Sequence, residues 1–275
     1  MDWIQTLVMA IVQGIAEFLP ISSSGHLCVL YDLFQQLGVN SETKSLTFNI
    51  ALHFGTLLSV LVVFWKRIWQ LLTSDRRVIL LLIVATIPAV IAKVLISKTL
   101  GDDLADKWLF ENSLLAGFCF PVTGFILMWF SNRSGETSCR DLSWIKAAFI
   151  GVIQAIAALF PGISRSGTTI CAGLFCGMNR AEAATFSFLM AIPAIGGGAL
   201  LEIHDFVKAM KDGKATFGSS HDLMLLGVGT LLSFVVGVLA LVFLLKWLQQ
   251  GKLKYFAYWL FLLGPVVIVW RLFFA

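Results

Sequence analysis

Pro161-Gly-Ile-Ser-Arg-Ser-Gly-Thr-Thr169 separates two strongly apolar segments, residues 147–160 and 170–178. An arginine at membrane depth costs at least about 2.5–3.5 kcal/mol, so Arg165 needs a specific reason to be there. Four hydroxyl side chains surround it, and two glycines allow backbone N–H groups to approach a ligand. The stretch therefore has two interpretations: an anion cradle, with phosphate as the first candidate, or a capped cytoplasmic turn with a solvated arginine.

The composition of the whole chain is that of an integral membrane protein. Of its 275 residues, 58% are hydrophobic and 13% are charged, whereas soluble domains are about half apolar and a quarter charged. Several apolar runs are long enough to cross a bilayer as helices, which predicts a single all-α polytopic membrane domain over residues 1–275. The net charge of +4 is spread over the connections, so nucleic acid is not an expected partner.

Hydropathy divides the chain into two similar halves, residues 1–133 and 144–275. Each half begins with two short apolar segments around a polar turn, which predicts a re-entrant helix hairpin. The hairpin segments are residues 3–19 and 27–37, and then 144–160 and 170–178. The expected spans cover residues 46–65, 78–95 (kinked or interrupted at Pro88) and 109–130, then 181–201 (broken near Pro193 and residues 196–198), 224–248 and 255–274.

The two halves also resemble each other in their letters. Gln13-Gly-Ile-Ala-Glu-Phe-Leu-Pro20 aligns with Gln154-Ala-Ile-Ala-Ala-Leu-Phe-Pro161, and Ser22-Ser-Ser-Gly25 aligns with Ser164-Arg-Ser-Gly167. Three spans in each half place the second half in the opposite direction across the membrane. We therefore predict an inverted repeat of two five-helix halves, with a shared site where the two hairpin turns meet.

The charges of the connections predict the orientation. Most of the Lys and Arg residues between spans fall on one side, which makes that side cytoplasmic. Both termini and the first hairpin then face outward, and the second hairpin enters from the cytoplasm.

The first hairpin carries an acid inside an apolar segment. Glu17 follows Gln13 by four residues, so both lie on one helix face, and a buried acid in a membrane segment is a functional candidate. Glu17 could hold a divalent cation or act as a general base. One carboxylate is few for a metal site, so phosphate oxygens would have to complete the coordination. The structural alternative is a protonated, hydrogen-bonded glutamic acid.

Ser23 and His26 lie three residues apart at the first turn. Such a pair could act as nucleophile and base, or the histidine could accept a phosphoryl group or protonate a leaving group. The alternative is that Ser24 or Ser23 caps the second helix and His26 lies in its first turn. For His53 and Asn49, both inside an expected span, we favour a structural role.

Together, Gln13-x-x-x-Glu17-Phe-Leu-Pro-Ile-Ser-Ser-Ser-Gly-His26 and Pro161–Thr169 resemble the two signature motifs of the bacterial undecaprenyl-pyrophosphate phosphatases of the bacitracin-resistance type. The resemblance covers essentially the whole chain in length and hydropathy. Many members of that family carry Glu where this chain has Gln13, which leaves Glu17 as the sole strong acid of the first motif.

The resemblance implies an enzyme of the bacterial plasma membrane that hydrolyses undecaprenyl pyrophosphate to undecaprenyl phosphate and phosphate, recycling the lipid carrier for cell-wall synthesis. It implies central roles for Glu17 and Arg165, a part for Ser23 and His26, and a divalent cation, Mg²⁺ or Ca²⁺, which Glu17 with Gln13 would hold. The candidate phosphate-binding residues are Ser22, Ser24, Gly25, Gly162, Ser164, Arg165, Ser166, Gly167, Thr168 and Thr169.

Inverted repeats with broken helices are also typical of transporters. Transport or flipping of a lipid phosphate through the same cavity is therefore the alternative function, whereas a purely structural scaffold leaves Glu17 and Arg165 unexplained. The sequence leaves open whether Ser23, His26 or water attacks phosphorus. It also leaves open the metal, the prenyl length and the oligomeric state, for which a homodimer is allowed.

Overall fold

The computed structural model describes residues 2–38, 46–101, 112–211 and 219–274, and every regular element within these ranges is a helix. The helices are α1 (Trp3–Ala16), α2 (Ser23–Gln36), α3 (Leu46–Val63), α4 (Trp65–Thr73), α5 (Arg76–Leu100), α7 (Ser113–Phe130), α8 (Trp144–Leu159), α9 (Arg165–Phe175), α10 (Arg180–Lys211), α11 (Ser220–Gln249) and α12 (Lys254–Phe273). In these ranges five helices are long and apolar enough to cross a bilayer, and the bent α3–α4 pair makes a sixth. The predicted polytopic all-α class is confirmed.

Both hairpin turns contain a proline followed by a serine that caps the second helix. α8 ends at Leu159, and Phe160 is extended because a proline disfavours helical backbone in the residue that precedes it; α1 ends at Ala16, four residues before Pro20. The second helices, α2 and α9, begin after the serine caps Ser22 and Ser164, whose hydroxyls accept the N–H groups of Gly25 and Gly167. The cap of α2 is therefore Ser22, and not Ser23 or Ser24.

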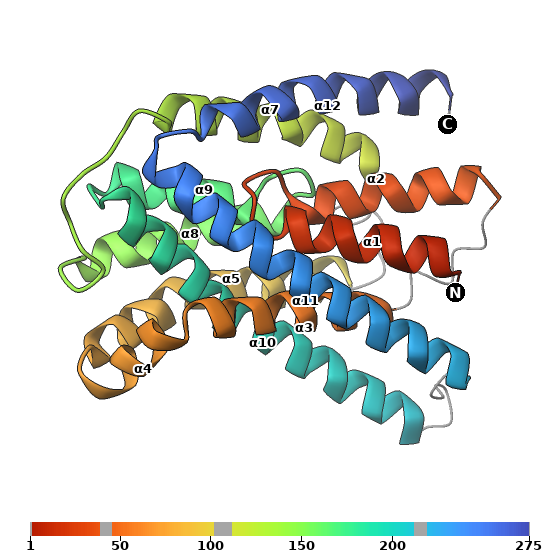
Figure 1. Cartoon of the computed structure of the whole chain (residues 1–275), viewed down its shortest axis with the longest axis horizontal. Helices are drawn as coiled ribbons and strands as arrows, with labels where there is room; N and C mark the ends of the chain where they lie inside the picture. Colours follow the sequence, from red (N-terminus) through yellow and green to blue (C-terminus); the bar gives the residue numbers. More distant parts are fainter. Residues whose placement is uncertain (1, 39–45, 102–111, 212–218, 275) are drawn as a thin grey trace.

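The helices of each half pack on helices of the other half. α1 packs along α11, while α8 packs along α5 (Figure 1). Both contacts are close enough to exclude a side chain: a Cβ on Gly14 would lie 2.9 Å from the Ser233 carbonyl oxygen, and one on Gly151 would lie 2.4 Å from that of Ala85. Neither half therefore encloses its own first helix. The inversion of the halves relative to a bilayer remains a prediction, although both termini lie at one end of the helix assembly (Figure 1).

Three expected spans differ in detail from the structure. The expected break near Pro193 is wrong, because α10 runs unbroken from Arg180 to Lys211. α5 is not interrupted at Pro88, and the alternative of a kink there stays a prediction. Membrane helices tolerate such prolines because neighbouring groups satisfy the freed carbonyl. The expected span 46–65 instead ends in a bend of 69° at Phe64, after which α4 begins. The first residues of the expected span 109–130 lie outside the described residues.

A buried group of aromatic rings joins the end of α1 to the bend after α3. Phe188 of α10 lies between Phe18 and Phe64, with ring centroids 5.8 Å and 6.1 Å away. All three rings are buried. Because Phe18 directly follows Glu17, this packing fixes the backbone that carries the first hairpin's acid.

Candidate active site

The two hairpin turns touch each other inside the protein. A Cβ on Gly25 would lie only 2.7 Å from the backbone nitrogen of Gly162, so the contact requires glycine. The Gly162 N–H donates to the Ser22 hydroxyl oxygen at 3.1 Å. Ser22 has a φ of 72°, unusual for a residue other than glycine, and its hydroxyl receives the N–H groups of both Gly25 and Gly162. Ser22 thereby links the first turn to the second.

Thr123 of α7 holds the second turn from the other side. Its hydroxyl donates to the Gly162 carbonyl oxygen at 2.9 Å and accepts the Ser164 N–H at 3.1 Å. The side chain is completely buried. Since these two bonds bracket residue 163, Thr123 determines where α9 begins and hence where Arg165 lies.

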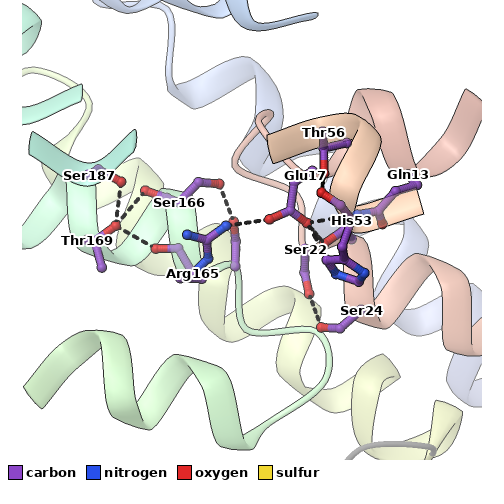
Figure 2. A network of polar contacts seen from close by, with 12 residues as sticks. Gln13, Glu17, Ser22, Ser24, His53, Thr56, Arg165, Ser166, Thr169 and Ser187 are labelled. Atoms are coloured by element: carbon purple, nitrogen blue, oxygen red, sulfur yellow. Dashed lines mark hydrogen bonds and ion pairs between the residues drawn. The ribbon is translucent and has the colours of Figure 1, made fainter. Parts of the chain in front are cut away.

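Glu17 and Arg165 form an ion pair between the two turns (Figure 2). The Arg165 guanidinium donates to Glu17 Oε1 from the opposite hairpin. The exposed fraction is 5% for the Glu17 side chain and 19% for that of Arg165. Charges removed from water to this degree need close partners, so each group makes the buried position of the other tolerable.

The other oxygen of Glu17 faces the first hairpin. Glu17 Oε2 accepts the Ser23 hydroxyl at 2.6 Å and the Gln13 amide nitrogen Nε2 at 3.2 Å. The Ser23 proton therefore points at a carboxylate, which is the arrangement of a hydroxyl nucleophile and its base. The expected helix-face pairing of Gln13 with Glu17 is present.

His53 of α3 approaches the same oxygen. Its Nε2 lies 4.0 Å from Glu17 Oε2, while its Nδ1 faces the Asn49 carbonyl oxygen at 2.8 Å, a contact in which the nitrogen must be the donor (Figure 2). The Asn49 side chain accepts the Tyr31 hydroxyl at 2.7 Å. From the sequence we favoured a structural role for His53, but the structure places it at the border of the site.

His26 is directed away from Ser23. Its Nδ1 donates to the Ser22 carbonyl oxygen at 2.8 Å, and its Nε2 accepts the Trp259 indole N–H at 3.0 Å. The ring also stacks on Trp259 and meets the edge of Phe120. Both ring nitrogens are engaged elsewhere, so this arrangement does not contain the expected Ser23–His26 pair.

The expected phosphate-binding residues divide into two groups. The hydroxyls of Ser166, Thr168 and Thr169 donate to backbone carbonyl oxygens, and that of Thr169 also meets Ser187 of α10 at 2.7 Å. Ser164 is occupied as the cap of α9. By contrast, Ser24 is exposed and Arg165 is partly exposed. The four hydroxyls of the second turn therefore shape that turn, whereas Ser24 and Arg165 remain accessible to a ligand.

The residues present fit a divalent cation only as part of its coordination. Glu17 contributes a carboxylate, and Gln13 Oε1 is buried without a hydrogen-bond partner, a state that normally costs about 1–3 kcal/mol. Within the described ranges no three His, Cys, Asp or Glu side chains gather at one point. Glu17 and Gln13 would therefore hold a cation together with oxygens from the ligand itself.

Three residues that shape the site were not singled out from the sequence: Thr123, Ser187 and, as a site residue, His53. Asn49, His53 and Thr56 recur at helical spacing within one apolar segment, and this polar stripe is the signal that would have identified α3 as a wall of the site. Thr123 is a single hydroxyl in an apolar stretch of α7, and Thr185, the hydroxyl nearest to Ser187 in α10, is two residues away on another helix face, so neither residue carries a comparable signal.

Known proteins resemble this chain over almost its whole length. The family model of the bacitracin resistance protein BacA matches residues 6–266. The undecaprenyl-diphosphatase of Rhodopirellula baltica is 42% identical over 272 residues, 98% of this chain and 99% of that protein. That of Thermodesulfovibrio yellowstonii is 39% identical over 265 residues, 96% of each chain. That of Carboxydothermus hydrogenoformans is 37% identical over 272 residues, 98% of this chain and 97% of that one.

The Thr123 contacts lead to a stability prediction. Thr123→Val keeps the shape of the side chain but leaves the buried Ser164 N–H and Gly162 carbonyl without their partner. We expect the free energy of unfolding to fall by about 1–3 kcal/mol, measured as a lower midpoint of thermal unfolding in detergent. Thr86→Val is the matched control, because Thr86 is buried and bonds only Leu82 of its own helix. Equal destabilisation by both variants would contradict the role of Thr123.

Proposed function

Since the chain belongs to the family of the bacitracin resistance protein BacA, we propose that it is an undecaprenyl-diphosphatase, an integral-membrane enzyme that hydrolyses undecaprenyl diphosphate to undecaprenyl phosphate and phosphate. Release of the monophosphate recycles the lipid carrier for cell-wall synthesis. The observation that carries the proposal is the Glu17 carboxylate, which receives the Ser23 hydroxyl on one oxygen and the Arg165 guanidinium on the other.

Arg165 is the residue that binds the diphosphate. Its guanidinium can form paired hydrogen bonds to phosphate oxygens, and it lies at the N-terminus of α9, where the helix dipole favours an anion. An arriving phosphate competes with Glu17 Oε1 for these donors. Binding therefore exchanges an internal ion pair for one with the substrate, and the prenyl chain lies between helices or in the surrounding lipid.

Ser23 is the group that we propose attacks the terminal phosphorus. Its proton passes to Glu17 Oε2, a bond forms between Ser23 Oγ and phosphorus, and the bond from phosphorus to the bridging oxygen breaks, releasing undecaprenyl phosphate. Water then cleaves the phosphoserine and yields phosphate. The alternative is direct attack by a water molecule that Glu17 deprotonates, with Ser23 as a hydrogen-bonding neighbour.

A divalent cation, Mg²⁺ or Ca²⁺, fits beside these groups. Glu17 and Gln13 would hold it, and when bound it would neutralise negative charge on the diphosphate. The orphaned Gln13 Oε1 supports this assignment, because a buried amide oxygen without a donor is satisfied by a cation.

The charge pair can be tested for catalysis separately from folding. Glu17→Gln removes the base and should lower phosphate release by about 10²–10⁴-fold, and Arg165→Gln should also abolish most activity while leaving Glu17 buried without its partner. The double variant Glu17→Gln with Arg165→Gln removes both charges, so we expect its thermal stability to recover towards that of the wild type while its activity stays lost.

The measurement is phosphate release from undecaprenyl diphosphate by purified protein in detergent, where no membrane separates two compartments. Absence of release by the wild type would overturn the phosphatase in favour of transport. Unchanged release by both single variants would show that the reaction occurs elsewhere.

The attacking group is identified by trapping. Rapid acid quenching with substrate labelled in its terminal phosphate should leave label on Ser23, and Ser23→Ala should lose both the label and nearly all turnover. Ser24→Ala, a change at the neighbouring exposed serine, is the control and should still form the labelled intermediate. If Ser23→Ala turns over at the wild-type rate, water attacks directly.

The cation is tested by removal and return. Chelation should abolish activity, and Mg²⁺ or Ca²⁺ should restore it. Gln13→Ala should raise the cation concentration required for half-activity by about 10–100-fold. Gln154→Ala is the matched control: it is the predicted repeat equivalent and also has a buried, unpartnered Oε1, but its amide nitrogen donates to Ala85 on α5. An equal shift in both variants would contradict a cation at Gln13.

A further inference from the structure

Helix α4 presents an apolar face that is not covered by the described part of the protein. Trp65 and Trp69 are 60% and 65% exposed, and Leu72 is 54% exposed. These three residues follow one another at helical spacing, so they form one stripe. On the adjacent face, Leu71 is buried and Ile68 packs against the core. We call Trp65, Trp69 and Leu72 the α4 stripe.

The direction of α4 separates it from the spans. The axis turns by 69° at Phe64, where a buried ring packs against Phe188. In Figure 1, α4 lies at the end of the assembly opposite the two termini. Exposed aliphatic residues also lie at the end of α3 (Leu61, Val62) and near the start of α5 (Leu80, Ile83), the two helices that precede and follow α4 in the chain. The α4 stripe therefore lies between two apolar helices that themselves expose aliphatic side chains.

The remaining face of α4 and the turn after it are basic. Arg67 is paired with Asp75 at 2.7 Å. Lys66 and Arg76 are exposed, and neither makes an ion pair with any carboxylate in the described ranges. The Lys66 ammonium lies 5.8 Å from the centre of the Trp65 ring. An exposed cation thus lies beside Trp65, and the Arg76 guanidinium donates to the carbonyl oxygen of Leu72 in the α4 stripe.

We propose that α4 is an interfacial helix that binds anionic phospholipid: the α4 stripe enters the boundary of the bilayer, and Lys66 and Arg76 pair with lipid phosphate groups. Tryptophans belong at this depth because the ring is amphipathic, and an amphipathic helix with a basic polar face lies in the plane of the interface. Its place in the chain between α3 and α5, which also expose aliphatic side chains, and its unpaired positive charge favour a lipid surface over a protein partner.

The position of α4 is tested with a spin label on the full-length protein in phosphatidylglycerol–phosphatidylcholine bilayers. All five native cysteines are buried, and burial raises the pKa of Cys139, so an added exposed cysteine is labelled selectively. We expect the label of Leu72→Cys to collide more with oxygen than with a water-soluble nickel complex, and that of Gln70→Cys, on the polar face, to show the reverse. A water-exposed label at position 72 overturns the proposal and indicates a surface for a protein partner.

The lipid preference is tested by energy transfer from a dye on Gln70→Cys to fluorescent phosphatidylglycerol or phosphatidylcholine. We expect phosphatidylglycerol to be enriched near the dye, and the enrichment to fall about fivefold for each charge removed in Lys66→Gln and Arg76→Gln, because each basic residue contributes about 1 kcal/mol near an anionic surface. Lys246→Gln with Lys254→Gln removes two exposed charges elsewhere and should leave the enrichment unchanged. Equal enrichment of both lipids, or an equal loss in the control, overturns the proposal. Phosphate release is measured separately and does not decide it.

Discussion

The contact between Glu17 and Arg165 is the interaction on which the site depends. Neither charge is tolerable alone at its depth, because an unpaired buried ion costs several kcal/mol. Each is supplied by a different hairpin, so the pair forms only when the two turns meet. Gly25 and Gly162 and the hydroxyls of Ser22 and Thr123 hold the backbones of the two turns together. They therefore position Glu17 and Arg165 without forming hydrogen bonds to either charged group.

This arrangement also explains why most hydroxyls of the second turn are not free. Ser164 caps α9, and the hydroxyls of Thr168 and Thr169 donate hydrogen bonds to backbone carbonyl oxygens. A polar turn at membrane depth must satisfy its own backbone before it can bind anything. Thr123 of α7 binds backbone groups of the turn and Ser187 of α10 meets the Thr169 hydroxyl, which leaves the partly exposed Arg165 guanidinium as the group we propose binds the anion.

The charged residues of the site and the two turns that carry them were predictable from the sequence, because a charge inside an apolar segment is costly and therefore indicates a specific role. Glu17, Arg165 and the paired turns were identified in that way. The bend at Phe64 was not, since it has neither proline nor glycine and lies where Phe64 packs against Phe188, a residue far away in the chain. The continuous α10 was missed for the opposite reason: Pro193 is a local break signal that tertiary surroundings override. Placing His53 at the site required knowing which face of α3 meets Glu17, and a contact between two different helices is not contained in local spacing.

The exchange of helices between the halves has a consequence for how the protein is made. α1 packs along α11, which begins about 200 residues later in the chain. At typical rates of synthesis, on the order of 5–20 residues per second, the ribosome needs roughly 10–40 s to deliver that partner. During this time the first hairpin has entered the insertion machinery without the helix that will cover it, and its acid has no arginine. Assembly therefore has to be completed after translation of the second half, and the nascent first half is the species that most needs protection from lipid and from quality-control proteases.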